Sequence, residues 1–322
     1  MHGSNYIPNA VANPLVLDVY DSNGNLISNP GFHPDGYMDI LYTGDLNGNF
    51  YTLKLYHPEL TGFKDTSNLF CIDIHKTKAI SSGHYDDNYY RGEYQPITVS
   101  PVAAFDANKK LRIYFGTGKY DDIVGESDDK HDKEPMSFYC LVEDESICGG
   151  DVSVSISPGN VKIPSSTQIC TSSGSHKWVK EDGTADGDTC FNCIFDLDID
   201  GERITDSALV AGSLVFFITF VPNDDPCAAG GDAYLYVLDY MCRPLDINPL
   251  EYSGLDITPI TVGSGAEEKI VAYKAKLGQG MPTRPVLDSS GKYVLVQTSD
   301  AKIHKIPVEI VRPVYLKGWK EE

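Results

Sequence analysis

The sequence predicts an all-β fold, because short apolar segments recur along the chain with turn residues between them. In two distant stretches, a proline opens an apolar strand that ends in an acidic residue, and a turn leads to a second apolar strand. The first stretch spans Pro101 to Asp106 and continues at 112–118, and the second spans Pro285 to Asp288 and continues at 293–298. Short strands repeated in this way are typical of β-propeller blades, so we expect a β-propeller.

The same signals place individual hairpins. Asn47-Gly48-Asn49 separates two apolar runs within 39–55, and Asn-Gly supplies the positive φ angles that a tight hairpin needs. A further hairpin is expected at 14–28, and no segment has a long helical period. The remaining clear strands are expected within four stretches, namely 195–220, 234–240, 256–276 and 285–308.

The length of 322 residues suits one large all-β domain. We expect residues 1–13 to be a cloning remnant or linker, because the chain starts with Met1-His2-Gly3-Ser4, and residues 14–322 to form a single propeller domain. Residues 145–190 do not fit the strand pattern, since they are rich in Ser, Gly and Thr and hold three cysteines. We expect this segment to be a surface insertion that is stapled by disulfides.

The formal net charge of −20 argues against nucleic acid and anionic lipid as partners, because both would be repelled. The same charge can attract divalent cations or basic protein patches, and its simplest alternative role is solubility. The longest apolar run, Leu214 to Val221, is far shorter than the roughly 20 residues that span a bilayer. We therefore expect no membrane span.

Eight cysteines in an acidic chain rich in Tyr and Asn indicate an oxidising compartment and disulfide bonds. Short loop closure weakly favours the pairs Cys140 with Cys148 and Cys227 with Cys242. The pair Cys190-Phe191-Asn192-Cys193 is a structural disulfide element, or alternatively a redox or zinc element. The disulfide candidates are Cys71, Cys140, Cys148, Cys170, Cys190, Cys193, Cys227 and Cys242.

A calcium site is predicted within residues 31–39. Asp35, Gly36 and Asp39 match positions five, six and nine of a calcium-binding loop, although the first and third positions lack the expected acidic or amide side chains. The alternative is a turn whose acids accept hydrogen bonds from backbone amides. The metal candidates, for Ca²⁺, are Gly31, His33, Asp35, Asp39 and Asp45.

A second acidic run, from Asp196 to Gly201, begins like an EF-hand loop. Ser207 occupies the twelfth position, where such a loop needs a bidentate Glu. Phe195, Leu197 and Ile199 alternate with the three Asp residues, which is the period of a half-buried strand. We therefore expect a strand with an acidic outer face that ends in a glycine turn.

The chain carries none of the common catalytic motifs, since it lacks H-E-x-x-H, G-x-S-x-G and a P-loop. We therefore expect no enzyme, and no catalytic or cofactor-binding residue is assigned. Because propeller enzymes can assemble a site from distant loops, a quinoprotein-type dehydrogenase stays the first alternative. Against it, both tryptophans, Trp178 and Trp319, lie outside the expected blade strands. A glycan-binding, lectin-like propeller is the other alternative.

Several stretches together resemble the C-terminal propeller of the PilY-type type IV pilus biogenesis factors and tip adhesins. They cover most of residues 15–320 in the order of that family, and the most specific of them runs from Gly201 to Ile204 and on through 216–227. The other stretches lie at 37–50, 95–98, 113–120, 293–306 and 318–321.

This resemblance implies a modified quinoprotein-like β-propeller, with about six to seven blades, on a larger secreted protein. It implies roles in pilus assembly, in opposing retraction and in surface adhesion. The implied partners are minor pilins of the pilus tip complex and host or abiotic surfaces, and the implied location is the outer-membrane-associated pilus tip at the cell surface. The calcium loop of the family falls on 31–39, where Gly31 and His33 depart from its pattern.

Overall fold

We describe the fold from a computed structural model, in which residues 11–19, 38–46, 48–55, 70–76, 95–106, 110–120, 136–142, 169–170, 192–223, 230–262 and 268–308 are described. These residues form seventeen β-strands and no helix. The all-β prediction is thus confirmed, and a membrane-spanning helix is absent from this part of the chain.

The first two sheets have the strand order of propeller blades, because each contains four antiparallel strands that follow one another as a meander. In the second sheet, a short strand is added in parallel at the outer edge. The first sheet contains β1 (Leu15–Leu17), β2 (Ile40–Gly44), β3 (Asn49–Leu55) and β4 (Phe70–Lys76). The second contains β5 (Val102–Phe105), β6 (Leu111–Gly116), β7 (Ser137–Val142), β9 (Asn192–Asp196) and, at the edge, β8 (Ile169–Cys170).

The third and fourth sheets depart from this four-stranded meander in strand order and in strand number. In the third sheet the strand that comes last in the sequence takes the fourth place, and the strand before it forms the outer edge. The third sheet contains, in spatial order, β10 (Leu209–Ala211), β11 (Leu214–Pro222), β12 (Gly231–Asp239), β14 (Lys269–Gln279) and β13 (Asp256–Val262). The fourth contains β15 (Val286–Leu287), β16 (Tyr293–Gln297) and β17 (Ile303–Pro307).

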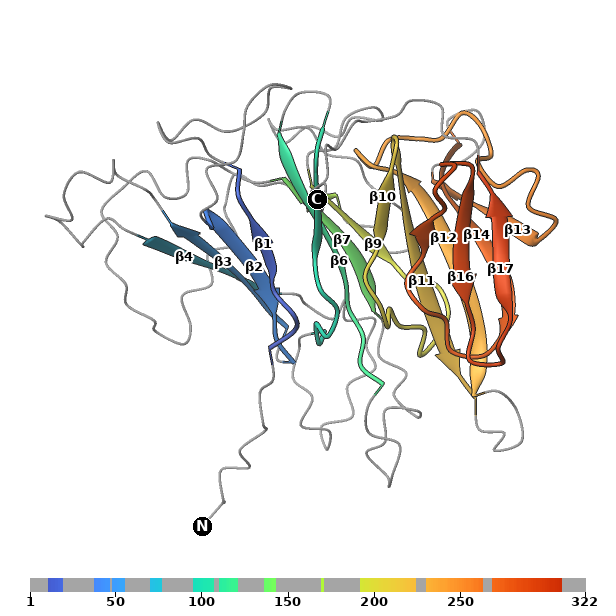
Figure 1. Ribbon diagram of the computed structural model, residues 1–322, viewed down its shortest axis with the longest axis horizontal. Coiled ribbons are helices and arrows are strands. Elements are labelled where there is room, and N and C mark those ends of the chain that lie inside the picture. The colour runs from blue at the N-terminus through green and yellow to red at the C-terminus, as the bar shows by residue number, and fades with distance from the viewer. Residues whose placement is uncertain are drawn as a thin grey trace, which may run out of the picture.

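The four sheets pack face to face in chain order (Figure 1). One apolar core cluster lies between the first and second sheets, another between the second and third, and another between the third and fourth. The first strands of the last three sheets, β5, β10 and β15, contact one another in sequence, as inner strands do around a propeller axis. The described sheets do not close into a ring, so the number of blades stays a prediction.

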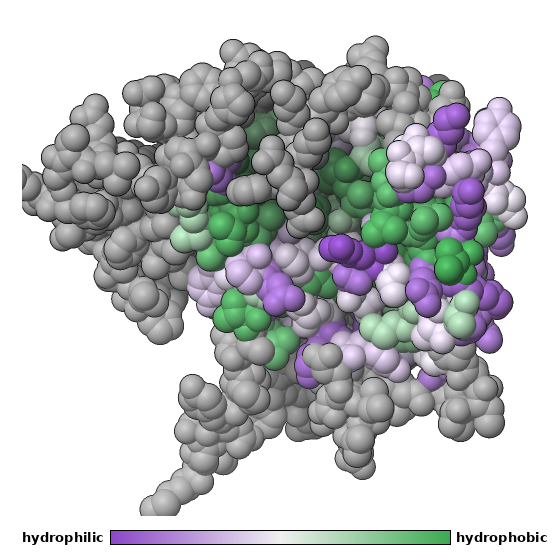
Figure 2. Space-filling model, in the orientation of Figure 1, coloured by the Kyte–Doolittle hydropathy of each residue, from purple (hydrophilic) through white to green (hydrophobic). Residues whose placement is uncertain are grey.

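The outer surface of this stack mixes polar and apolar residues, as Figure 2 shows over the third and fourth sheets. The register of the fourth sheet places Val286 beside Leu295, on the face opposite to the buried Val294 and Val296. No described sheet covers this face, and Ile303, at the start of β17, is 68% exposed.

Several local predictions are confirmed. The hairpin at 39–55 forms between β2 and β3, and Gly48 in its turn has a φ of 75°. The pairs expected at 256–276 and 285–308 form between β13 and β14 and within the fourth sheet. The strand expected at the start of 14–28 pairs with β2; the rest of that hairpin and most of the 145–190 segment lie outside the described residues.

Candidate functional site

A repeated joint connects successive sheets at one end of their strands. The segment before β5 carries Gln95-Pro96-Ile97, and the segment before β10 carries Glu202-Arg203-Ile204. The amide of Ile97 donates to the Asp45 carbonyl at 2.9 Å, and the amide of Ile204 donates to the Thr117 carbonyl at 3.0 Å. Each connector is thereby bonded back to the preceding sheet.

Glycine is required under each isoleucine. A Cβ added at Gly44 would overlap the side chain of Ile97, and a Cβ added at Gly116 would overlap the side chain of Ile204. The two glycines occupy the same place in their sheets, because each ends the second strand and pairs with a phenylalanine of the third. The joint therefore depends on close approach of the connector to the strand.

Stacked aromatic rings form the apolar part of both joints. Phe50 stacks on Phe115 across the first joint, with ring centroids 4.2 Å apart and planes within 7°. Phe138 stacks on Phe217 across the second joint at the same distance and within 6°. Such pairs add to the stabilisation that comes from burying the rings.

A polar side chain closes the first joint. The Oε1 atom of buried Gln95 accepts hydrogen bonds from the Thr117 hydroxyl at 3.1 Å and the Tyr139 hydroxyl at 2.7 Å. Its Nε2 atom donates to Ser137 Oγ at 2.9 Å. All three bonds join neutral groups, so the amide satisfies its buried partners without introducing charge.

The second joint has a carboxylate at this place. Glu202 is fully buried, and its Oε1 atom accepts hydrogen bonds from the Thr219 hydroxyl and, at 2.8 Å, from the Tyr236 hydroxyl. Its Oε2 atom lies 3.2 Å from Lys274 Nζ. The joint therefore contains a buried ion pair, which needs further hydrogen bonds to offset the loss of hydration.

Lys274 connects this buried carboxylate to the surface. Its Nζ atom lies 2.7 Å from Asp198 Oδ1, and the two side chains are 8% and 65% exposed. The ammonium also lies 4.5 Å from the ring centroid of Tyr234 and 5.0 Å from that of Tyr236. We call Asp198, Glu202, Thr219, Tyr236 and Lys274 the acid–lysine cluster.

The pKa shifts in the acid–lysine cluster have opposite directions. Burial raises the pKa of Glu202, although Lys274 and the two hydroxyl donors favour its charged form. Burial acts in the same sense on Asp198, but the hydrogen bond and charge of Lys274 outweigh it and lower the pKa of that carboxyl. Burial, with the nearby carboxylates, raises the pKa of Tyr236 well above its usual value, so this phenol stays a proton donor.

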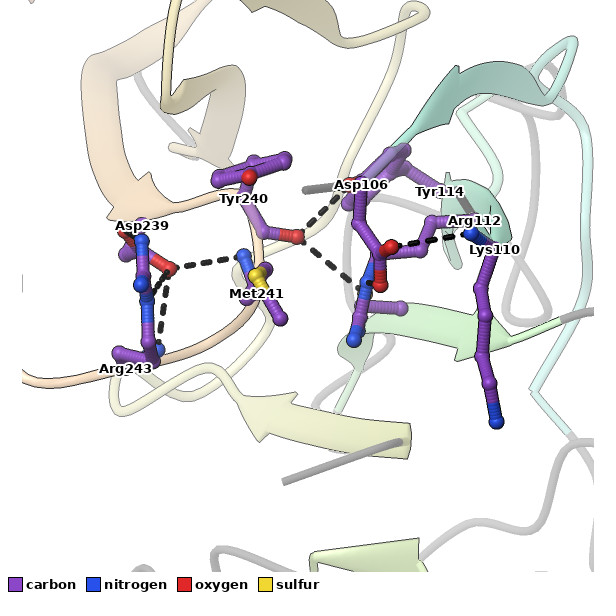
Figure 3. A network of polar contacts seen from close by, with 9 residues as sticks. Asp106, Lys110, Arg112, Tyr114, Asp239, Tyr240, Met241 and Arg243 are labelled. Atoms are coloured by element: carbon purple, nitrogen blue, oxygen red, sulfur yellow. Dashed lines mark hydrogen bonds and ion pairs between the residues drawn. The ribbon is translucent and has the colours of Figure 1, made fainter. Parts of the chain in front are cut away.

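A separate network lies between the second and third sheets at the opposite end of their strands (Figure 3). Arg112 Nε lies 2.8 Å from Asp106 Oδ2, and both side chains are buried. The Tyr114 hydroxyl donates to the Tyr240 carbonyl of the third sheet at 2.7 Å. The Asp239 carboxylate accepts from the Met241 amide at 2.8 Å and pairs with Arg243 Nη2 at 2.8 Å. Polar bonds thus join these two sheets at both ends.

The chain has relatives among pilus proteins. It is 28% identical over 220 residues to a type IV pilus biogenesis factor PilY1 homolog from Xylella fastidiosa strain Temecula1, covering 64% of this chain and 13% of the relative. It is 24% identical over 275 residues to PilY1 of Pseudomonas aeruginosa strain UCBPP-PA14, covering 69% and 22%. The match to PilY1 of strain PAO1 has 24% identity over 263 residues and covers 74% and 21%.

The fold has a solved counterpart. The crystal structure of the Pseudomonas aeruginosa PilY1 C-terminal domain superposes with a TM-score of 0.55 and 18% identity, covering 96% of this chain and 62% of that domain. The chain is related to the PilY-type biogenesis factors. No family model matches it, and its matches span about a fifth or less of the length of these curated PilY1 relatives.

The calcium loop implied by the PilY-type resemblance is only partly described. Gly31, His33 and Asp35 lie outside the described residues, so this site stays a prediction. Asp39 is buried directly before β2, and its Oδ2 atom accepts a hydrogen bond from the Val19 amide at 2.6 Å. Among the described residues, no group of three acidic, His or Cys side chains could hold a metal.

Asp45 lies far from Asp39 along the chain direction of β2. The two residues flank β2, and a strand rise of about 3.3 Å per residue places them roughly 20 Å apart. The Asp45 carboxylate instead accepts a hydrogen bond from the Tyr51 hydroxyl at 2.7 Å. A calcium loop containing Asp39 therefore needs its other ligands from elsewhere.

The acidic run at 196–201 is shorter as a strand than its alternation predicts. Strand β9 ends at Asp196, whose carboxylate accepts a hydrogen bond from Ser137 Oγ at 2.8 Å. A turn at Gly201, with a φ of 73°, then sends Glu202 into the joint, while Asp198 binds Lys274. The run thus supplies Asp198 to the acid–lysine cluster, and Glu202 follows it directly. The sequence pattern did not predict this cluster, although 201–204 stood out for its resemblance to the PilY-type family.

The predicted disulfide cysteines differ in whether the structure shows them as free, as bonded or not at all. Cys140 is a buried free thiol, so its suggested disulfide with Cys148 is not formed. The reason is its place on β7, where its sulfur lies 3.8 Å from Arg112 Nη1 and 3.8 Å from the Tyr240 carbonyl. Cys242 is disulfide-bonded, whereas Cys148, Cys190 and Cys227 lie outside the described residues, so the pairing with Cys227 stays a prediction.

Proposed function

We propose that this chain is a non-catalytic binding and assembly module of a type IV pilus biogenesis factor. The observation that carries the proposal is the match to PilY1 proteins over 64–74% of the chain. The similar fold of the PilY1 C-terminal domain, covering 96% of the chain, supports it. The expected location is secreted, at the outer-membrane-associated pilus tip.

The mechanism we propose is docking of a rigid scaffold. Stacked rings, close-fitting glycines and buried polar bonds hold the second sheet between its neighbours, so the sheets act as one support for the loops. Those loops and the outer strand edges would contact minor pilins of the tip complex and host or abiotic surfaces. A net charge of −20 favours partners with basic patches.

A structural role within the scaffold accounts for the polar groups of the acid–lysine cluster. Glu202, Lys274 and Tyr236 bond mainly to one another across the joint, which is how structural ion pairs are satisfied. A quinoprotein-type dehydrogenase remains a competing assignment that a direct assay decides. Purified protein with Ca²⁺ and the quinone should not reduce a dye, and turnover would contradict the proposal. Selective glycan binding on an array would instead favour the lectin-like alternative.

The test in cells is an in-frame deletion of the segment encoding this chain, with the rest of the gene intact. We expect loss of surface pili and of twitching motility. Removing the retraction ATPase as well should restore pili if the module opposes retraction, and should leave the cells bald if it is needed for assembly. Normal piliation, motility and surface attachment in the single deletion would contradict the proposal.

The test in solution is binding of the purified chain to purified minor pilins by biolayer interferometry. We expect saturable binding that weakens as salt rises, because surface charges are screened. The Lys276→Ala variant is a matched control for general surface effects, since its exposed pair with Asp232 lies outside the joints. No measurable affinity for any minor pilin would contradict a direct docking role.

A further inference from the structure

Three cysteines lie side by side on neighbouring strands of the second sheet. Cys140 on β7 is opposite Cys193 on β9 in the antiparallel register. Cys193 is in turn opposite Cys170 on β8 in the parallel register. The fold therefore forms a row of Cys140, Cys193 and Cys170 from residues that are far apart in the sequence.

Such a row allows two alternative disulfides. Neighbouring strands lie about 4.8 Å apart, and disulfides need Cα atoms roughly 4.4–6.8 Å apart. Residues directly opposite each other also belong to the same face of a sheet. The register therefore places the Cys193 backbone at a spacing that allows a disulfide to either neighbour, but a cysteine can form only one such bond.

Cys140 already has a role as a thiol. It is 1% exposed, its sulfur accepts a hydrogen bond from Arg112 at 3.8 Å, and its S–H donates to the Tyr240 carbonyl at 3.8 Å. Formation of a disulfide would remove this S–H donor from the joint between the second and third sheets. Burial also raises the pKa of the Cys140 thiol, which disfavours the thiolate that disulfide exchange requires.

We propose that Cys170 and Cys193 form a disulfide across β8 and β9 and that Cys140 stays reduced. The two thiols lose two protons and two electrons to the disulfide of a thiol–disulfide oxidoreductase, which becomes a dithiol as the Sγ–Sγ bond forms. The bond fixes β8, which has only two residues, to the edge of the sheet. It thereby anchors the chain between β7 and β9 at Cys170.

The proposal is tested by peptide mapping of the unreduced protein, alkylated in denaturant at low pH so that thiols do not exchange. We expect one cross-linked pair of peptides that contains Cys170 and Cys193, and an alkylated Cys140. A bond from Cys193 to Cys140, Cys190 or any other cysteine would overturn the proposal. So would an alkylated Cys193.

Serine variants give a second readout that depends on the same row. Cys193→Ser and Cys170→Ser should each raise the number of titratable thiols by one, because each releases the partner of the lost residue. Cys140→Ser is the matched control: it should lower the number by one and keep the Cys170–Cys193 peptide. A thiol count that falls by one in Cys193→Ser would mean that Cys193 was already free and would overturn the proposal.

Discussion

Glu202 occupies in the second joint the place that Gln95 occupies in the first. Thr117 and Thr219 each lie two residues after the stacked phenylalanine of their strand, and Tyr139 and Tyr236 each lie opposite that phenylalanine. In both joints the threonine and tyrosine hydroxyls donate to the Oε1 atom of the connector residue. The residue opposite the tyrosine on the next strand differs between the joints. Ile194 lies opposite Tyr139 in the first joint, whereas Lys274 lies opposite Tyr236 in the second.

This equivalence predicts that the second joint can be converted into the first. Glu202→Gln alone should destabilise the protein by about 1–3 kcal/mol, because an amide NH₂ would replace the Oε2 atom that faces the Lys274 ammonium and would leave two donors pointing at each other. The double variant Glu202→Gln, Lys274→Ile should recover most of that loss, since it reproduces the neutral set of Gln95 and Ile194. Urea unfolding of the four proteins in this cycle measures the effect.

The control for that cycle is Lys276→Ala, whose exposed ion pair with Asp232 should contribute less than about 1 kcal/mol. A double variant no more stable than Glu202→Gln alone would contradict the equivalence of the two joints.

Stability should depend on pH through Glu202. Its pKa is raised in the folded state above the usual value of 4.5, so the folded protein binds this proton more tightly than the unfolded chain does. The resulting stabilisation is fully present below 4.5 and is lost as the pH rises through the raised pKa. Wild type should therefore gain stability relative to Glu202→Gln as the pH falls through this range.

The measurement is urea unfolding of both proteins at several pH values. Asp198, whose pKa is lowered, changes stability in the opposite sense, because its contribution is lost as the pH falls through that lowered value. Since Asp198 is present in both proteins, its effect largely cancels in the comparison. A difference between wild type and Glu202→Gln that does not vary with pH would contradict the prediction.

The glycine at each joint should resist enlargement. Gly116→Ala places a methyl group against the side chain of Ile204, and we expect a destabilisation of about 1–3 kcal/mol from overpacking. Adding Ile204→Val should recover part of the loss, because it removes the crowding Cδ1 methyl group of Ile204. Thermal unfolding of the single and double variants measures this coupling, and additive losses would mean that the two residues do not compete for space.

Calcium should raise the melting temperature of the wild type more than that of Asp35→Ala or Asp39→Asn, if 31–39 binds the ion. Asn at position 39 can still accept the hydrogen bond from the Val19 amide, so the change tests the charge rather than the fold. Asp45→Asn is the matched control and should respond like the wild type, because Asp45 lies at the other end of β2. Equal responses in all the proteins would remove this loop as a calcium site.

The sequence predicted the elements that depend on local chemistry. The Asn-Gly turn before β3 and the apolar runs of β11 and β12 were predictable because turn preference and strand period are set by neighbouring residues. The end of β9 was not, since the alternation from Phe195 to Ile199 continues past Asp196, where the strand ends.

The candidate site depended on contacts that no local pattern encodes. Glu202 and Lys274 lie far apart in the sequence and meet because the fourth position of the third sheet is taken by β14, not by β13. The Cys140 thiol likewise contacts the Tyr240 carbonyl, which directly follows β12 of another sheet. The repeat of Gln95-Pro96-Ile97 in Glu202-Arg203-Ile204 was visible, but two short, partly dissimilar segments do not reveal a joint until Gly44 and Gly116 are placed beneath them.

The separate nature of these joints has a mechanical consequence. A pull that separates the first sheet from the third passes through the two joints in series, so the weaker of them sets the force at which these three sheets part. Stacked rings and the neutral amide of Gln95 hold the first joint, whereas the second joint combines stacked rings with the charges of Glu202 and Lys274. Acidic conditions would therefore change the force that the second joint withstands and leave the first joint unchanged.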